Sequence, residues 1–114
     1  MAMKEIDLLQ GTLDLLILKT LSTEPMHGYR IAARIQQLSD EVLRIEEGSL
    51  YPALYRLEQK GFIESEWGMT DTNRKAKFYK LTRKGRAEMD VEAESWQRLS
   101  RAVARVLRSI EQGV

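Results

Sequence analysis

Residues 46–63 read EEGSLYPALYRLEQKGFI and contain a regular row of leucines. Leu50, Leu54 and Leu57 recur at helical spacing, so they form one apolar face that packs inward. Gly61 then supplies the left-handed residue that commonly follows a helix C-terminus. The opposite face is polar and aromatic rather than plainly charged, which suggests that it contacts a partner.

Further elements lie on both sides of this helix. Periodicity and turn residues predict helices over residues 11–21, 28–38 and 82–112, a short strand at 44–45, and a hairpin of strands 62–67 and 76–81 joined by the polar loop 68–75. Thr12 and Thr82 are the expected N-caps of the first and last helices. This order predicts an α+β, mostly α fold: a winged helix-turn-helix with a long C-terminal dimerisation helix.

The last helix is too long for the preceding elements to cover, at about 45 Å for about 1.5 Å per residue. Its apolar side chains follow a heptad pattern that is interrupted at Glu92. The expected dimer-interface residues are Met89, Trp96, Leu99, Val103, Val106 and Ile110. A second copy of the chain is the simplest partner for this seam. We therefore expect a DNA-binding domain over residues 1–81 and a dimerisation helix over residues 82–114.

In a helix-turn-helix, the recognition helix enters the major groove with its N-terminal residues foremost. Ser49 is the expected N-cap, with Pro52 in the first turn. The residues expected on the DNA side are Ser49, Tyr51, Pro52, Tyr55 and Arg56. Their hydroxyls suit phosphate oxygens, and Arg56 suits a phosphate or a guanine edge. The alternative is that both tyrosines are half-buried packing residues with solvated hydroxyls.

Charge is distributed unevenly, although the net charge is only +1. Between residues 74 and 86 the chain has Lys and Arg but no Asp or Glu. Such a local basic stripe is typical of a polyanion contact, although it also suits a solvated edge that discourages aggregation. Within the predicted wing, Arg74, Lys75 and Lys77 are placed to enter the minor groove or to hold the neighbouring backbone.

Other function classes find little support. The chain has one His and no Cys, and it lacks a phosphate-binding glycine motif, so we expect no catalytic residues, no metal site and no cofactor. His27 precedes a glycine at a helix start, where capping or packing is its simplest role. The absence of a signal peptide or a membrane-length apolar run predicts a cytoplasmic protein. The serious alternative is a winged-helix module that binds protein instead of DNA.

The stretches GTLDLLILKTL, HGYRI, GSLYPALYRLEQKGFI and KFYKLTRKGR together resemble the PadR family of bacterial transcriptional regulators. The resemblance covers nearly the whole chain and is most specific in the third stretch. It implies a homodimeric repressor that binds pseudo-palindromic promoter DNA and is released by a signal. It also implies the subgroup with a single C-terminal helix.

By motif position, the resemblance makes Tyr51, Pro52 and Arg56 recognition-helix residues, and makes Arg74, Lys75 and Lys77 wing residues. The wing loop MTDTNRKA departs from the arginine-rich tips common in the family. The stretch ESWQR resembles members in which a tryptophan from each protomer flanks a channel. Trp96 would then stack on a small aromatic or phenolic effector. The alternative is that Trp96 is a packing residue of the dimer seam.

Overall fold

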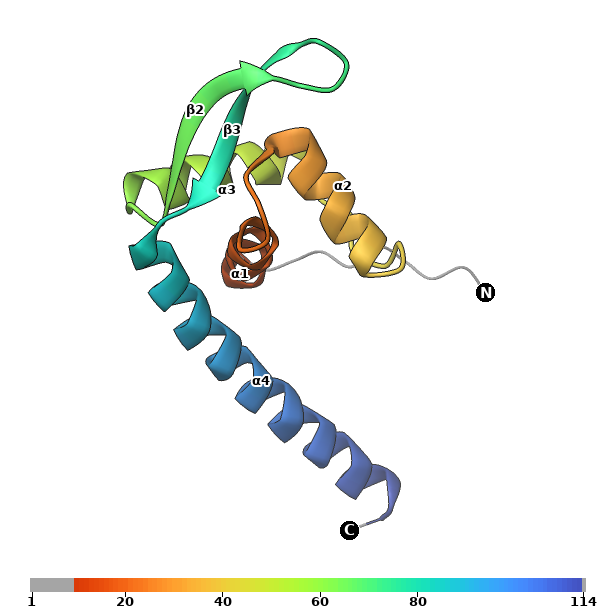
Figure 1. Ribbon diagram of the computed structural model, residues 1–114. Coiled ribbons are helices and arrows are strands. Elements are labelled where there is room, and N and C mark those ends of the chain that lie inside the picture. The colour runs from red at the N-terminus through yellow and green to blue at the C-terminus, as the bar shows by residue number, and fades with distance from the viewer. Residues whose placement is uncertain (1–9, 114) are drawn as a thin grey trace.

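The computed structural model describes residues 10–113. Its elements in chain order are α1 (Gln10–Leu21), β1 (Met26–His27), α2 (Gly28–Leu38), α3 (Glu47–Gln59), β2 (Ile63–Met69), β3 (Lys75–Leu81) and α4 (Arg83–Glu111). Three helices and a small antiparallel sheet form the body, and α4 leaves it as a long arm (Figure 1). This is the winged helix-turn-helix with a long C-terminal helix that the sequence predicts.

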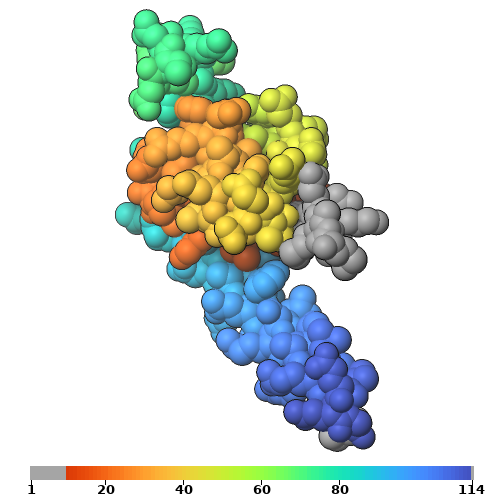
Figure 2. Space-filling view, turned by 90° about the vertical axis from the view of Figure 1, so that its right-hand side faces the viewer, coloured from red at the N-terminus to blue at the C-terminus, as the bar shows by residue number. Residues whose placement is uncertain are grey.

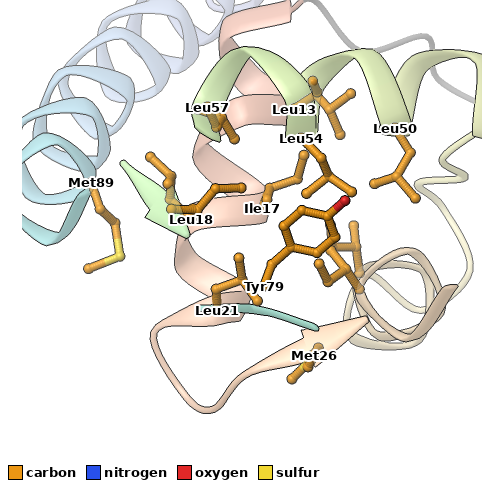
Figure 3. Close-up of a cluster of buried hydrophobic side chains, with 14 residues drawn as sticks. Leu13, Ile17, Leu18, Leu21, Met26, Leu50, Leu54, Leu57, Tyr79 and Met89 are labelled. Carbon is orange, nitrogen blue, oxygen red and sulfur yellow. The ribbon is translucent and has the colours of Figure 1, made fainter. Parts of the chain in front are cut away.

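The core is centred on α1, because this helix is apolar on several faces and contacts α2, α3 and α4. Ile17 and Leu18 are fully buried. In Figure 3 they lie between Leu54 and Leu57 of α3 and Tyr79 of β3. A helix that is apolar on most sides is buried on most sides, so α1 acts as the axis around which the other elements are held.

The sheet differs from expectation in two respects. Its strand order is β1-β3-β2, and β1 pairs Met26 with Tyr79 and His27 with Phe78. The predicted strand at residues 44–45 is wrong, since that segment is irregular. A two-residue strand such as β1 has no periodicity to detect, and only its pairing with β3 defines it.

The hairpin is longer than predicted, and its loop is shorter. The β2–β3 ladder continues to the pair Met69 and Lys75, which leaves Thr70–Arg74 as the turn. Thr70 N–H donates to the Arg74 carbonyl at 2.8 Å, and Asn73 N–H donates to the Thr70 carbonyl at 2.9 Å. Asn73 has a positive φ of 64°, the left-handed conformation that Asn tolerates well. The loop expected over residues 68–75 is therefore a shorter turn closed by hydrogen bonds.

The helix starts confirm some predicted caps and correct others. His27 Nδ1 accepts the Arg30 N–H, and Thr82 Oγ1 accepts the Gly85 N–H, so both residues cap the helices that follow them. Thr12 lies inside α1, and Ser49 is the third residue of α3, whose N-cap is Glu46. Pro52 accordingly lies in the second turn of α3, not in the first.

The arm formed by α4 is attached through its first two turns. Gly85 and Met89 are buried, and Met89 joins the α1 core from the side of Leu18 (Figure 3). The remainder of α4 projects away from the body (Figure 2). Among the described helices, including α4, none is long and apolar enough to cross a membrane.

Candidate nucleic-acid interface

One face of α3 is exposed at its N-terminal half. Leu50, Leu54 and Leu57 are buried as predicted. Tyr51 is 46% exposed and Tyr55 is 65% exposed. Ser49 and Pro52 are also exposed. This face therefore presents three hydroxyl groups and the proline ring to solvent, close to the helix N-terminus.

Tyr51 is held in place by the start of α2. A Cβ added at Gly28 would lie 2.9 Å from Tyr51 Cε1 and 3.0 Å from its hydroxyl oxygen. These separations are shorter than van der Waals contact, so only glycine allows the phenol ring to lie against the backbone here. The ring thus lies against the first residue of α2, beside a helix N-terminus, and helix N-termini attract anions.

The Arg56 side chain is directed toward α1 and is less exposed than that of Tyr55, so its expected placement is corrected, whereas its role in DNA binding stays a prediction. Its Nη2 donates to Asp14 Oδ1 of α1 at 3.0 Å, and its side chain is 31% exposed. Arg56 Nε is buried without a partner among the described residues. Burial raises the pKa of the Asp14 carboxyl above its ordinary value, and the Arg56 charge partly opposes this shift. Arg56 thus connects the recognition helix predicted from the sequence, α3, to α1.

The wing places its basic side chains unequally. Arg74 is exposed in the turn, and its backbone N–H donates to Thr70 Oγ1 at 3.1 Å. Lys75 Nζ lies 5.5 Å from the centre of the exposed Trp67 ring, within cation–π range. Lys77 lies two residues below the turn, where its Nζ is 3.8 Å from Glu58 Oε1. Arg74 and Lys75 form the basic tip, whereas Lys77 belongs to its base.

The basic stripe is also partly compensated, contrary to the sequence interpretation. Besides the pair of Lys77 with Glu58, Lys80 Nζ lies 3.3 Å from Glu64 Oε1 across the sheet. These acids lie outside residues 74–86, so the local sequence does not reveal them. The free cationic charge of the wing is therefore concentrated near its tip.

A groove of about 890 Å³ separates the wing from the start of α2. We call it the wing groove. Its lining includes the predicted residues Tyr51, Arg74, Lys75 and Lys77. Ser49, Pro52 and Tyr55 are not among the lining residues; they extend the same surface along α3. Tyr79 is a buried residue of the lining. Burial raises the pKa of its phenol, and the negative charge of Glu58 raises this pKa further.

Tyr29 and Arg30 are among the groove residues that sequence reasoning missed. Tyr29 is 75% exposed, and Arg30 lies beside it in the first turn of α2. Arg30 Nη2 is 3.0 Å from Glu24 Oε1, in an exposed ion pair that contributes little to stability. The usable signal was the HGYR sequence itself, because an aromatic and a cation at a helix start suit a phosphate.

The side chains of this groove are better suited to binding a polyanion than to catalysing a reaction. The groove offers guanidinium and ammonium groups, phenol hydroxyls and a helix N-terminus, all of which bind phosphate oxygens. No group of three or more His, Cys, Asp or Glu side chains that could hold a metal ion occurs within residues 10–113.

The arm shows a second exposed feature. Trp96, Leu99, Val103, Val106 and Ile110 are all exposed large hydrophobics, and they lie on one side of α4. Val91 and Leu107 are exposed as well and were not predicted. The prediction for Met89 is corrected, because Met89 is 3% exposed and belongs to the hydrophobic core of this chain rather than to the exposed stripe.

Comparison with known proteins gives a consistent result. The sequence profile of the Transcriptional regulator PadR-like family matches residues 17–91. A transcriptional regulator of Mycobacterium tuberculosis is 35% identical over 87 residues, which cover 76% of this chain and 78% of that protein.

Solved structures agree with this match. The structure of a transcriptional regulator from Clostridium thermocellum superposes with a TM-score of 0.76 at 30% identity, covering 84% of this chain and 93% of the other. A PadR-like transcriptional regulator from Bacillus cereus gives a TM-score of 0.73 at 28% identity, covering 86% and 93% of the two chains.

Proposed function

This chain belongs to the PadR-like family of transcriptional regulators, and we propose that it acts as a dimeric repressor that binds pseudo-palindromic promoter DNA. Family membership makes the chain a regulator and not an enzyme, in agreement with the sequence prediction. Beyond family membership, we propose which surface binds DNA, that the protein is a dimer, and that it represses transcription.

The observation that carries the proposal is the convergence of three elements on the wing groove. Tyr51 comes from α3, Tyr29 and Arg30 come from α2, and Arg74 and Lys75 come from the wing. In the proposed complex, the exposed face of α3 enters the major groove with Ser49, Tyr51, Pro52 and Tyr55. The wing tip and the start of α2 then hold the phosphates on either side, and Lys77 joins them at the base of the wing.

The exposed stripe of α4 supports dimerisation. The side of α4 that buries Met89 continues beyond the body as Trp96, Leu99, Val103, Val106 and Ile110. An apolar stripe of this length is costly in water, and a two-fold seam would cover it with identical residues. Such a dimer would place two recognition helices on one duplex, about 34 Å apart if they occupy successive major-groove turns.

We also propose that a small aromatic or phenolic effector releases the DNA. Trp96 is 46% exposed and begins the free part of the seam. Two such rings, one from each protomer, would offer flat faces to a flat ligand. Because α4 is attached directly to α3 and the wing, a ligand that changes the angle between two α4 helices would change the spacing of the recognition helices.

The experiment is fluorescence anisotropy with labelled DNA from immediately upstream of the gene, compared with a scrambled duplex of equal length. We expect a steep salt dependence and at least about 1000-fold preference for the upstream DNA. Equal and weak binding to both duplexes would place the operator elsewhere. Absence of binding to either duplex at low salt would favour the alternative, a winged-helix module that binds protein.

A further inference from the structure

The outer side of α4 carries a charged surface that the proposed function does not use. Arg98, Arg101, Arg105 and Arg108 are all exposed. Their spacings of three, four and three residues place them in one row, about 15 Å long at about 1.5 Å per residue. We call these four residues the arginine row. Within residues 10–113, no ion pair involves any of them.

The arginine row lies opposite the apolar stripe of α4. At about 100° per residue, its centre is about 160° around the helix from the centre of the stripe. A seam built on Val103 and its neighbours therefore leaves the row facing outward. The row also lies on the arm, at the opposite end of the protein from the wing (Figures 1 and 2).

The chemistry of the row favours phosphate over a protein partner. The residues beside it are polar or small, such as Gln97, Ala102 and Ser109. One acid, Glu94, lies four residues before its start, and another, Glu111, lies three residues after its end. The hot spots of tight protein interfaces, which include arginine as well as tryptophan and tyrosine, lie in well-packed and desolvated pockets, and the row contains no aromatic or large apolar side chain to build such a pocket. Binding to a phosphate backbone needs only cations, because the release of counterions drives it. Arginine also bonds phosphate oxygens in pairs through its planar fork.

We propose that the arginine row is a second, sequence-independent binding surface for duplex DNA, distinct from α3 and the wing. A dimer would then carry two outward rows besides its operator-binding face. It could hold a neighbouring DNA segment while bound to its operator, so that one dimer bridges two segments. The inference uses the proposed seam only to establish which side of α4 stays free.

The test compares three double variants on a labelled scrambled duplex of about 30 bp, roughly three helical turns. Arg101→Gln/Arg105→Gln removes the centre of the row, and Arg74→Gln/Lys75→Gln removes the wing tip. Lys19→Gln/Arg34→Gln is the matched control, because it removes the same charge from α1 and α2. Glutamine preserves helix propensity at the row, and circular dichroism with sedimentation would verify the fold and assembly of each variant.

DNA affinity falls as salt rises, and the steepness of this fall counts the phosphate contacts. We expect the fall to be less steep in the row variant than in the control, by about two units of slope of log affinity against log salt. The row variant should also abolish the retention of a labelled scrambled duplex on beads that carry upstream DNA and bound protein. A row variant that matches the control in both assays overturns the inference. The inference is also overturned if the row variant loses binding to vesicles rich in anionic lipid but binds DNA as the control does. A failure of the proposed function would give a different result. The wing variant, Arg74→Gln/Lys75→Gln, would then bind DNA with the same affinity and salt dependence as the control variant.

Discussion

At the scale of single residues, two side chains of α3 that the sequence assigns to DNA binding are positioned by groups from other helices. Gly28 provides the space for the Tyr51 ring, and Asp14 draws Arg56 away from the surface. Both effects join elements that are far apart in sequence. Helical periodicity places a residue on a face, but it does not show which neighbour lies against that face.

Gly28→Ala should lower DNA affinity without unfolding the protein. Gly28 is not among the positive-φ residues, so alanine fits the backbone. The added Cβ would lie 2.9 Å from Tyr51 Cε1, and the partly exposed ring can swing away. We expect an affinity loss of about 1 kcal/mol, or five- to tenfold, measured by anisotropy.

The control is Gly11→Ala in α1, where an added Cβ meets no atom within 4 Å. It should leave DNA affinity unchanged. If Gly28→Ala binds as tightly as Gly11→Ala, Tyr51 has no positioned role in binding.

Arg56→Ala should affect folding stability more than DNA specificity. The pair with Asp14 is mostly buried, so a double-mutant cycle of Arg56→Ala and Asp14→Ala in urea should give a coupling of about 0.5–3 kcal/mol. A variant of unchanged stability that loses only operator affinity would instead support the base-reading role inferred from the sequence.

At the scale of elements, contacts at the joint where α3, the wing and α4 meet fix the direction of α4 relative to α3. Thr82 Oγ1 donates to the Gly61 carbonyl at 2.7 Å, and Lys84 Nζ donates to the Lys60 carbonyl at 2.8 Å. A Cβ at Gly85 would lie 1.9 Å from the Phe62 carbonyl oxygen. These contacts attach α4 directly to the end of the recognition helix, so the direction of the arm and that of α3 are linked.

Gly85→Ala should therefore destabilise this joint. The clash is with backbone, which cannot move as a flexible side chain does. Overpacking of this kind typically costs about 1–3 kcal/mol, measurable from the urea midpoint. Stability equal to the parent protein would mean that the first turn of α4 is not held tightly against Phe62.

The acids between α1 and α4 supply a pH-dependent prediction. Burial raises the pKa of Glu88, and a hydrogen bond and charge repulsion from Glu92 raise it further. Glu92 also contributes to the raised pKa of Asp14. A raised carboxyl pKa in the folded state means that stability falls as pH rises from the ordinary value through the folded value. Glu92→Gln should therefore stabilise the protein at pH 7 by about 0.2–0.5 kcal/mol.

This gain should shrink as the pH falls through the carboxyl range, because protonation already removes the repulsion. Urea denaturation at several pH values measures the effect. Glu94→Gln removes the same charge from an exposed position on α4 and serves as the control. A gain that persists at low pH would show that the repulsion is not its cause.

The sequence predicted the order of the helices because α2 and α4 have strong periodicity, α1 is rich in leucine, and end signals such as Gly61 and Thr82 are clear. It missed β1, which exists only through pairing with β3. It placed Met89 in the dimer seam because the heptad continues through it, although the first turns of α4 face α1. For the site, the exposed tyrosines were predicted, whereas the start of α2 and the pairing of Lys77 depend on tertiary contacts.

At the scale of the whole molecule, the protein has two projecting parts on one compact body. The wing and α4 extend to opposite ends (Figures 1 and 2), and the long axis measures 57 Å. The body is small, and the apolar stripe of α4 lies outside it. The proposed dimer accounts for this shape, because pairing two arms would cover both stripes and set two DNA-binding faces at a fixed separation.

Val103→Glu should convert the dimer into a monomer. Val103 lies at the centre of the exposed stripe, and two-fold pairing would bring two carboxylates together in an apolar seam. Sedimentation velocity measures the assembly, and Gln97→Glu, away from the stripe, is the matched control. A dimer that survives Val103→Glu would show that the protomers associate through another surface.

The central claim is that DNA occupies the face made by the start of α2, the N-terminal half of α3 and the wing tip. Hydrogen–deuterium exchange of the protein with and without its upstream DNA tests this most directly. We expect slower exchange of backbone amides over residues 28–31, 48–55 and 70–76. Tight binding of upstream DNA with unchanged exchange in all three segments, and protection elsewhere, would contradict it.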